Sequence, residues 1–177
     1  SPSPLELPDH PAEVRLEHFE DRGAGGFFST PDDHEKLLHR AKPGHDSAMP
    51  SGNGMAAQAL IRLAALTGED RYARAAERTL ELFYPAMRDR PAGFGQLALA
   101  LGECLAPPRV LVLRGEREAL HPWQAELARE YLPDTLVLAV ESGLPGLPPA
   151  LDKPARPEPV NGWVCRGVTC LEPIAEL

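Results

Sequence analysis

Apolar residues recur at helical spacing through the middle of the chain. From Gly54 to Thr67 they repeat every three or four positions, which predicts an amphipathic helix. Ser51 or Asn53 can cap the free amides of this helix, and Gly68 supplies the left-handed residue that ends it. A second periodic stretch follows after a very short link, so the two helices are expected to form an antiparallel hairpin.

The second helix is expected to open at Glu69-Asp70, with acids at the positive end of its dipole. Its apolar stripe is expected to be buried and consists of Tyr72, Ala76, Leu80, Phe83, Tyr84 and Met87. Pro85 lacks an amide proton and collides with the preceding turn, which predicts a kink or stop near Tyr84. The charged residues are expected on the wet outer face and are Arg71, Arg74, Glu77, Arg78 and Glu81. A third helix is predicted from about Phe94 to Leu105.

Beyond residue 108 the helical period gives way to continuous apolar runs. Residues 110–113 and 135–140 predict strands that are covered on both faces. The stretch between them predicts a helix with Pro122 in its first turn and a buried stripe of Leu120, Trp123, Leu127 and Tyr131. Strand, helix and strand together predict a βαβ unit with a right-handed crossover. Residues 162–165 are the best candidate for a third strand.

These patterns predict a mainly α chain with an α/β part. Residues 1–107 form the helical-hairpin region, and residues 108–177 form a small α/β module that includes a proline-rich connector at 143–161. The first 53 residues are rich in Pro, Gly and acids. Within them, Gly25-Gly26-Phe27-Phe28 predicts a tight approach of the backbone into a short strand.

Composition excludes several classes of partner. With 18 Lys and Arg against 26 Asp and Glu, the formal charge of −8 argues against a nucleic-acid partner or an anionic membrane surface. No stretch approaches the apolar length of a membrane helix, and no signal peptide is visible. Three cysteines are too few for a disulfide scaffold, so a reducing cytoplasm is the default location. No G-x-G-x-x-G or Walker-type loop follows either strand, and no cofactor is expected.

The most unusual segment is the loop at residues 45–53. It brings a carboxylate (Asp46), a hydroxyl (Ser51) and an amide (Asn53) to the start of a helix, where free amides favour an anionic or hydroxyl-rich ligand. In the plainer interpretation, Ser51 and Asn53 cap the helix and Asp46 closes an Asx-turn. His45 is either a proton carrier beside Asp46 or an exposed loop histidine.

Two other groups carry weaker signals. Asp32-Asp33-His34 resembles acid and base machinery, but adjacent carboxylates usually point apart, so a solvated turn is favoured. Cys165 and Cys170 enclose four residues, a spacing that permits a disulfide or half of a metal site. No second cysteine pair is present, so no metal is expected, and two partly buried thiols are the default, with a redox role as the alternative.

Four segments occur in the order found in a known family. They are Gly25-Gly26-Phe27-Phe28, Asp46-x-Ala48-x-Pro50-Ser51-Gly52-Asn53, the run from Leu63 to Gly68, and Val164-Cys165-Arg166 with Thr169-Cys170. On these residues the chain resembles the C-terminal part of the spermatogenesis-associated, thioredoxin-domain-containing protein family. The resemblance covers most of residues 23–172 and implies a longer protein. A thioredoxin-like domain would precede an (α/α)6 toroid similar to the N-acylglucosamine 2-epimerases.

The resemblance implies only the last hairpins of such a toroid, without thioredoxin catalysis. It would place the loop at the ligand cavity, with Asp46 as a carboxylate contact or proton carrier and with His45, Ser51 and Asn53 binding a sugar-like molecule. Gly54 stands where relatives usually carry Ser, a change expected to loosen the helix start. The alternatives are a helical-hairpin scaffold for protein partners and a thiol-based accessory module using Cys165 and Cys170. Hairpin faces left open in an incomplete toroid predict self-association.

Overall fold

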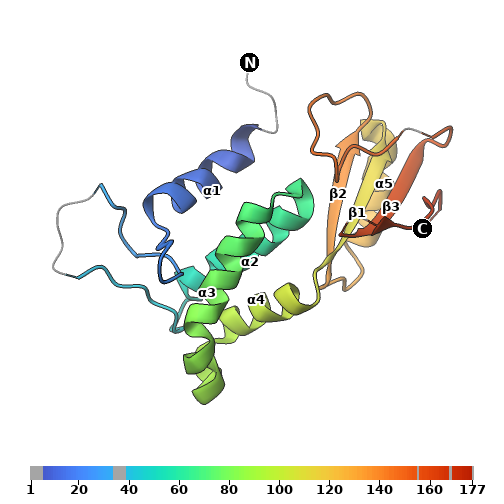
Figure 1. Cartoon of the computed structure of the whole chain (residues 1–177). Coiled ribbons are helices and arrows are strands. Elements are labelled where there is room, and N and C mark those ends of the chain that lie inside the picture. The colour runs from blue at the N-terminus through green and yellow to red at the C-terminus, as the bar shows by residue number, and fades with distance from the viewer. Residues whose placement is uncertain (1–5, 34–38, 155, 168, 177) are drawn as a thin grey trace. The chain divides into compact units, whose positions relative to one another are not determined.

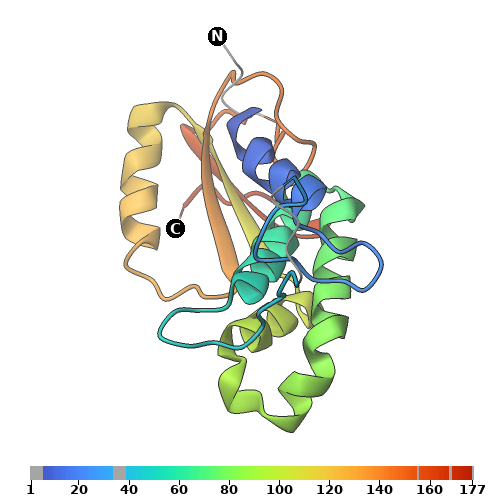
Figure 2. The same cartoon turned by 90° about the vertical axis from the view of Figure 1, so that its left-hand side faces the viewer.

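The computed structural model describes residues 6–33, 39–154, 156–167 and 169–176. The chain divides into two compact units, one of residues 1–64 and 69–106 and the other of residues 65–68 and 107–177. The first unit is helical, and the second contains the sheet (Figure 1 and Figure 2). The predicted class, helices together with an α/β part, is confirmed at this level.

The helical unit follows the predicted periodicity closely. Its described elements are α1 (Glu6–His18), α2 (Gly52–Thr67), α3 (Asp70–Asp89), a 3₁₀ turn (Pro91–Gly93) and α4 (Gly95–Leu105). Gly68 separates α2 from α3 with φ of 77°, the left-handed geometry predicted for it. The core of the unit is built around Tyr72 and Leu97, both fully buried. Met55 and Tyr84 were expected in the buried stripes, but they are 50% and 52% exposed.

Pro85 was predicted to kink or end the helix near Tyr84. The predicted end is wrong, because α3 continues past Pro85 to Asp89. Both Pro85 and Glu81 lie on the exposed side of the helix. Water can therefore hydrate the Glu81 carbonyl that loses its intrahelical partner, which lowers the cost of an interior proline.

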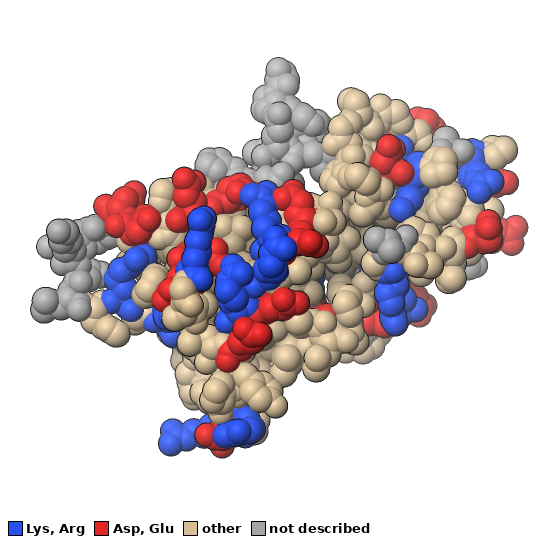
Figure 3. All heavy atoms as spheres, in the orientation of Figure 1, with Lys and Arg blue, Asp and Glu red and all other residues tan. Residues whose placement is uncertain are grey.

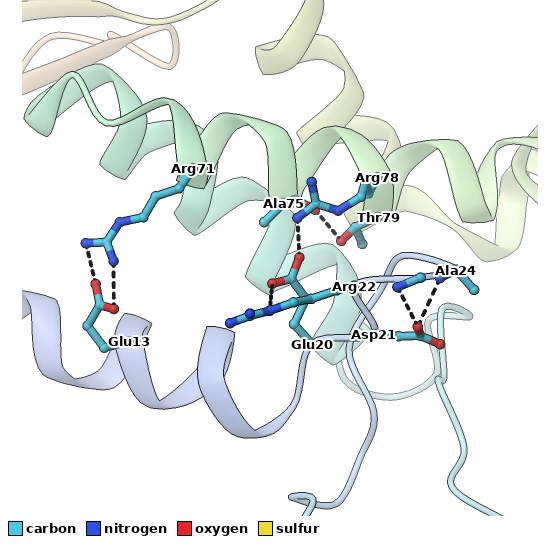
Figure 4. A network of polar contacts seen from close by, with 10 residues as sticks. Glu13, Glu20, Asp21, Arg22, Ala24, Arg71, Ala75, Arg78 and Thr79 are labelled. Atoms are coloured by element: carbon cyan, nitrogen blue, oxygen red, sulfur yellow. Dashed lines mark hydrogen bonds and ion pairs between the residues drawn. The ribbon is translucent and has the colours of Figure 1, made fainter.

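The sequence did not predict α1, because its polar sequence gives no apolar stripe. Ion pairs join this segment to α3 (Figure 4). Glu13 accepts hydrogen bonds from Arg71 at 2.8 and 2.5 Å, and Glu20 pairs with Arg78. Arg71 and Arg78 therefore bind a neighbouring segment and also lie on the predicted charged outer face. Basic and acidic side chains alternate on this face (Figure 3). Leu16 adds a buried apolar contact.

The glycines at 25 and 26 make the tight approach that was predicted. Both have positive φ, and a Cβ on Gly25 would lie 2.3 Å from the carbonyl oxygen of Arg78. The predicted strand shrinks to a single bridge between Glu20 and Phe27. Lys42 stabilises this turn by donating hydrogen bonds to the Asp21 carboxylate at 2.8 Å and to the carbonyl of Gly25 at 2.9 Å. The Lys42 hydrogen bond is the main reason that the pKa of Asp21 falls to about 2.

The second unit contains the predicted βαβ element and a four-stranded sheet among the described residues. Its elements are β1 (Arg109–Gly115), α5 (Arg117–Leu127), β2 (Thr135–Glu141), β3 (Val160–Arg166) and β4 (Thr169–Cys170). The strand order is β2-β1-β3-β4, with β1 parallel to β2 and antiparallel to β3. The third strand is confirmed, whereas β4 was not predicted. One face packs on α5 through Leu111 and Leu113, and the other carries Val110 and Val112.

Two predictions for α5 are wrong. The helix ends at Leu127, so Tyr131 lies beyond it and is 89% exposed. Pro122 is inside the helix rather than in its first turn, where exposed Pro122 and Glu118 leave the freed carbonyl open to water. None of the helices in the described part of the chain combines the length and apolar character needed to cross a bilayer.

We expect Glu20→Gln to destabilise the chain by about 1–3 kcal/mol, because its carboxylate is 5% exposed and compensates the Arg78 charge. Urea unfolding monitored by circular dichroism measures the loss. Glu17→Gln is the matched control: this exposed residue of α1 has no ion pair in the described residues, so its change should stay within about 0.5 kcal/mol. Equal losses in the two variants would contradict the role of the Glu20–Arg78 ion pair in holding the segment after α1 against α3.

Candidate functional site

Asp46 joins the starts of two helices. Its Oδ1 accepts a hydrogen bond from the backbone amide of Ser51 at 2.8 Å, just before α2. Its Oδ2 accepts one from the amide of Gln96 at 2.9 Å, in the first turn of α4. The backbone amide of Asp46 in turn donates to the carbonyl of Gly93 at 2.8 Å. The carboxylate therefore fixes the loop against two sets of free helix amides.

These contacts determine the protonation of Asp46. Burial opposes ionisation, but hydrogen bonds donated by the amides of Gln96 and Ser51 outweigh it and hold the pKa of the carboxyl below its ordinary value. A general acid needs a pKa raised toward the working pH, which is the opposite direction. The geometry thus favours a positioning role for Asp46 over proton transfer, and the predicted Asx-turn is replaced by these longer-range bonds.

Asn53 is a buried connector between distant segments. Its Oδ1 accepts from the amide of Phe27 at 2.6 Å, and its Nδ2 donates to the carbonyls of Phe27 at 3.0 Å and Pro43 at 2.9 Å. The residue is 2% exposed. This placement differs from the predicted one, in which Asn53 faces a ligand or caps the helix, because all three contacts are with backbone groups of its own chain.

Ser51 caps α2, as the plainer interpretation predicted. Its Oγ accepts from the amide of Gly54 at 3.1 Å, and the residue is 5% exposed, so the hydroxyl does not face outward. A Cβ on Gly54 would lie 2.7 Å from Cγ of Gln96 and 2.9 Å from Oγ of Ser51. Gly54 was expected to loosen the helix start; instead it gives Gln96 room to pack against it.

His45 presents the exposed surface of the same loop. Its imidazole lies edge-on to the Phe94 ring, with centroids 5.5 Å apart, and a Cβ on Gly93 would come within 2.3 Å of Nε2. Ser47 and Met49 beside it are also exposed. Among the predicted residues, His45 therefore remains the one with a side chain open to a ligand. The roles of Phe94 and Gln96 were missed, because only tertiary folding brings them to the loop.

The remaining candidates lie elsewhere. Asp32 bonds His18 at 2.9 Å, Asp33 is exposed, and His34 is outside the described residues. The Asp32 hydrogen bond raises the pKa of His18 and makes the pair a surface contact. Within the part of the chain that the structure describes, no group of three or more His, Cys, Asp or Glu is placed to hold a metal ion.

Cys165 and Cys170 face each other across β3 and β4 and form a disulfide, with Cα atoms 3.9 Å apart. The default expectation of two separate thiols is therefore wrong, and the disulfide alternative is correct. An Arg166-Gly167 turn, with Gly167 at φ of 56°, brings the two strands together. Cys104 is a free cysteine, and burial raises the pKa of its thiol.

Two cavities of the helical unit lie away from the loop. One of about 570 Å³ is lined by Glu13, Leu16, Glu17, Glu20, Arg22, Arg71, Arg74 and Arg78. The other, of about 190 Å³, is lined by Glu77, Leu80, Glu81, Tyr84, Leu101 and Cys104. The first is crossed by the ion pairs of α1 and α3, so its opposite charges largely neutralise each other. The second is an apolar hollow on the α3 and α4 face.

The chain matches none of the protein-family models with which it was compared, and no curated protein matches it either.

We expect Asp46→Asn to lower the free energy of unfolding by about 1–3 kcal/mol at pH 7, since an amide cannot accept both backbone bonds as an anion does. Asp46 has a folded-state pKa below its ordinary value of 3.8. Its contribution is therefore present above pH 3.8 and is lost as the pH falls through the lowered value. The difference between wild type and Asp46→Asn should begin to narrow below about pH 4 and close once the pH has fallen past the lowered pKa.

Urea unfolding at a series of pH values from 7 to 2.5 measures this convergence. Asp152→Asn is the control, because Asp152 is exposed and lies in the other unit, and its effect should be small at every pH. A difference between wild type and Asp46→Asn that stays constant down to pH 2.5 would contradict the role given to the carboxylate.

Proposed function

We propose that the chain is part of a helical-hairpin toroid of the spermatogenesis-associated, thioredoxin-domain-containing family, and that the loop at residues 45–53 forms part of its carbohydrate-binding surface. One observation carries the proposal: two of the four segments on which the resemblance rests are bonded to each other. Asn53 of the second segment binds the backbone of Phe27 in the first, and within the second segment Asp46 accepts a hydrogen bond from the amide of Ser51. A motif shared for its geometry would have this property, because each part positions the next.

The exposed side of the loop suits a sugar. His45 and Ser47 offer polar atoms for hydroxyl groups, and Met49, 74% exposed, offers an apolar surface for the C–H face of a ring. In this proposal Asp46, Ser51 and Asn53 position the loop, and His45 contacts the ligand. The substrate class is N-acyl sugars and sugar phosphates, and the reaction is unassigned because toroid shape implies none.

We expect at least one member of a panel of N-acyl sugars and sugar phosphates to raise the melting temperature of the chain. At a ligand concentration one hundred times Kd, the stabilisation is about 2.7 kcal/mol, which is several degrees for a domain of this size. His45→Ala and Ser47→Ala should reduce the shift, whereas His121→Ala, an exposed histidine of α5, should not. No shift with any sugar, or an unchanged shift in His45→Ala, would contradict the proposal.

The apolar face of α3 and α4 supports the hairpin part of the proposal. Tyr84 lines the 190 Å³ hollow and is 52% exposed, and Leu105 at the end of α4 is 78% exposed. In a toroid such a face would pack against another hairpin, and in a preparation of this chain alone a second copy would occupy it. The face is then a contact surface and not a ligand site.

We expect the chain to self-associate and Tyr84→Glu to shift it toward monomer, because a charge on this face would have to be desolvated in the contact. Light scattering after size-exclusion chromatography, over a range of concentrations, measures the mass. Leu171→Glu is the control, since Leu171 is similarly exposed, at 67%, but belongs to the other unit. A wild-type monomer at every concentration would contradict the assignment of this face.

A further inference from the structure

Buried nitrogen donors in the α/β unit lack acceptors. Arg114 is 7% exposed near the carboxyl end of β1, and its Nε and Nη1 have no hydrogen-bond partner. Trp163 on β3 has a buried indole Nε1 without a partner as well. Among the described residues, no carboxylate lies within 4.0 Å of the Arg114 guanidinium nitrogens. In the described part of the chain, the Arg114 guanidinium, with Nε and Nη1 buried, therefore has no carboxylate partner.

The strand register places these donors on one face of the sheet. Arg114 is opposite Asn161, and Val112 is opposite Trp163, in the antiparallel pairing of β1 with β3. Directly opposed residues share a face, as do alternate residues of a strand, so Arg114 and Trp163 are diagonal neighbours. Such neighbours lie about 7–8 Å apart, within the reach of long side chains. Leu151 of the segment joining β2 to β3 packs on this same face, in a cluster with Val112 and Trp163.

The chemistry of the donors defines what is missing. Guanidinium and indole N–H groups donate hydrogen bonds and accept none. An unpaired charge is costly to bury, so an acceptor that carries negative charge would stabilise this position most. Arginine is suited to carboxylate and phosphate, whose oxygens match its planar fork. Asn161, 4% exposed, adds a polar group beside Arg114 and is held by a 3.2 Å bond to the carbonyl of Glu158.

The position within the sheet is also one that binds ligands in α/β folds. Arg114 and Val140 are register partners near the carboxyl ends of the parallel strands β1 and β2. From the carboxyl end of β1 the chain enters α5, which covers one face of the sheet. From the carboxyl end of β2 it enters a segment whose Leu147 and Leu151 pack on the other face. Crevices of this kind, where successive connections go to opposite faces, are preferred ligand positions. Gly143 and Gly146, both with positive φ, lie at the start of that segment.

We propose that Arg114 and Trp163 form a binding site for the carboxylate or phosphate group of a small molecule, at the carboxyl end of β1 beneath the segment that joins β2 to β3. The site is separate from the sugar-binding surface proposed for the helical unit, and neither depends on the other. Arg114 supplies the charge, and the Trp163 indole supplies a further donor that sets the orientation of the anion.

The test titrates the 177-residue chain with inorganic phosphate and, separately, with acetate, against chloride at constant ionic strength. The indole Nε1–H signal of Trp163 is followed by NMR and assigned with Trp163→Phe. One of the two anions, or both, should move this signal saturably, and the identity of the effective anion distinguishes phosphate from carboxylate. The same anion should raise the melting temperature of wild type.

Arg114→Met should abolish both responses and should raise the melting temperature in chloride, because it removes an unpaired buried charge. Arg114→Lys, which retains the charge without the fork, should weaken the apparent Kd at least tenfold. Arg109→Met is the matched control: Arg109 lies at the other end of β1 and pairs with Asp134 at 3.0 Å. General salt effects act on all variants alike.

The proposal is overturned if neither anion moves the indole signal of wild type, or if Arg114→Met responds as wild type does. A lower melting temperature of Arg114→Met in chloride would also count against it, because it would mean that the guanidinium is already satisfied within the chain.

Discussion

The side-chain amide of Asn53 meets the backbone of Phe27 and Pro43 inside the helical unit, where no water can replace it. Each buried backbone amide or carbonyl in an irregular segment needs such a partner, because leaving it unpaired costs free energy comparable to a lost hydrogen bond. The segments that carry Phe27 and Pro43 have little regular structure of their own. Their path over α2 and α3 is therefore determined by what Asn53 and the two glycines before Phe27 permit.

Asp46 extends the same constraint to α4. Two helix starts leave free amides that repel each other electrostatically, and one carboxylate placed between them compensates both. These hydrogen bonds stabilise the loop. Because they also keep the carboxylate ionised, Asp46 is unsuited to act as a general acid near neutral pH. The exposed side chains of the loop, His45 foremost, are then held on a preorganised base. This division between supporting and contacting residues is what a binding surface requires.

The sequence predicted the helices and strands whose apolar pattern is visible within one short stretch of the chain. The periodic α2 and α3 and the continuous strand run of β1 bury their own side chains, so the pattern of the chain reports them directly. The run of β2 did predict a strand, but its expected coverage on both faces is wrong, because β2 lies at the edge of the sheet and only Val140 of it is buried. The helix α1 escaped prediction because the partner of its Glu13, Arg71, is far away in the sequence. The same applies to Ser51 and Asn53: their residue types indicated a site, but whether they face outward depends on Gly54, Gln96 and Phe27, which only the folded chain brings together.

The loop around Asp46 and the buried face around Arg114 differ in how their polar groups are satisfied. In the loop around Asp46, the polar groups of Ser51 and Asn53 meet partners from the same chain, and these residues are explained by folding alone. Trp163 packs in an apolar cluster, but its indole Nε1 has no hydrogen-bond partner among the described residues. Arg78 and Arg109 also have an unpartnered Nε, yet each pairs with a carboxylate, whereas Arg114 has no ion pair in the described part of the chain. The unsatisfied donors are thus stronger evidence of function than the polar cluster that first stood out in the sequence.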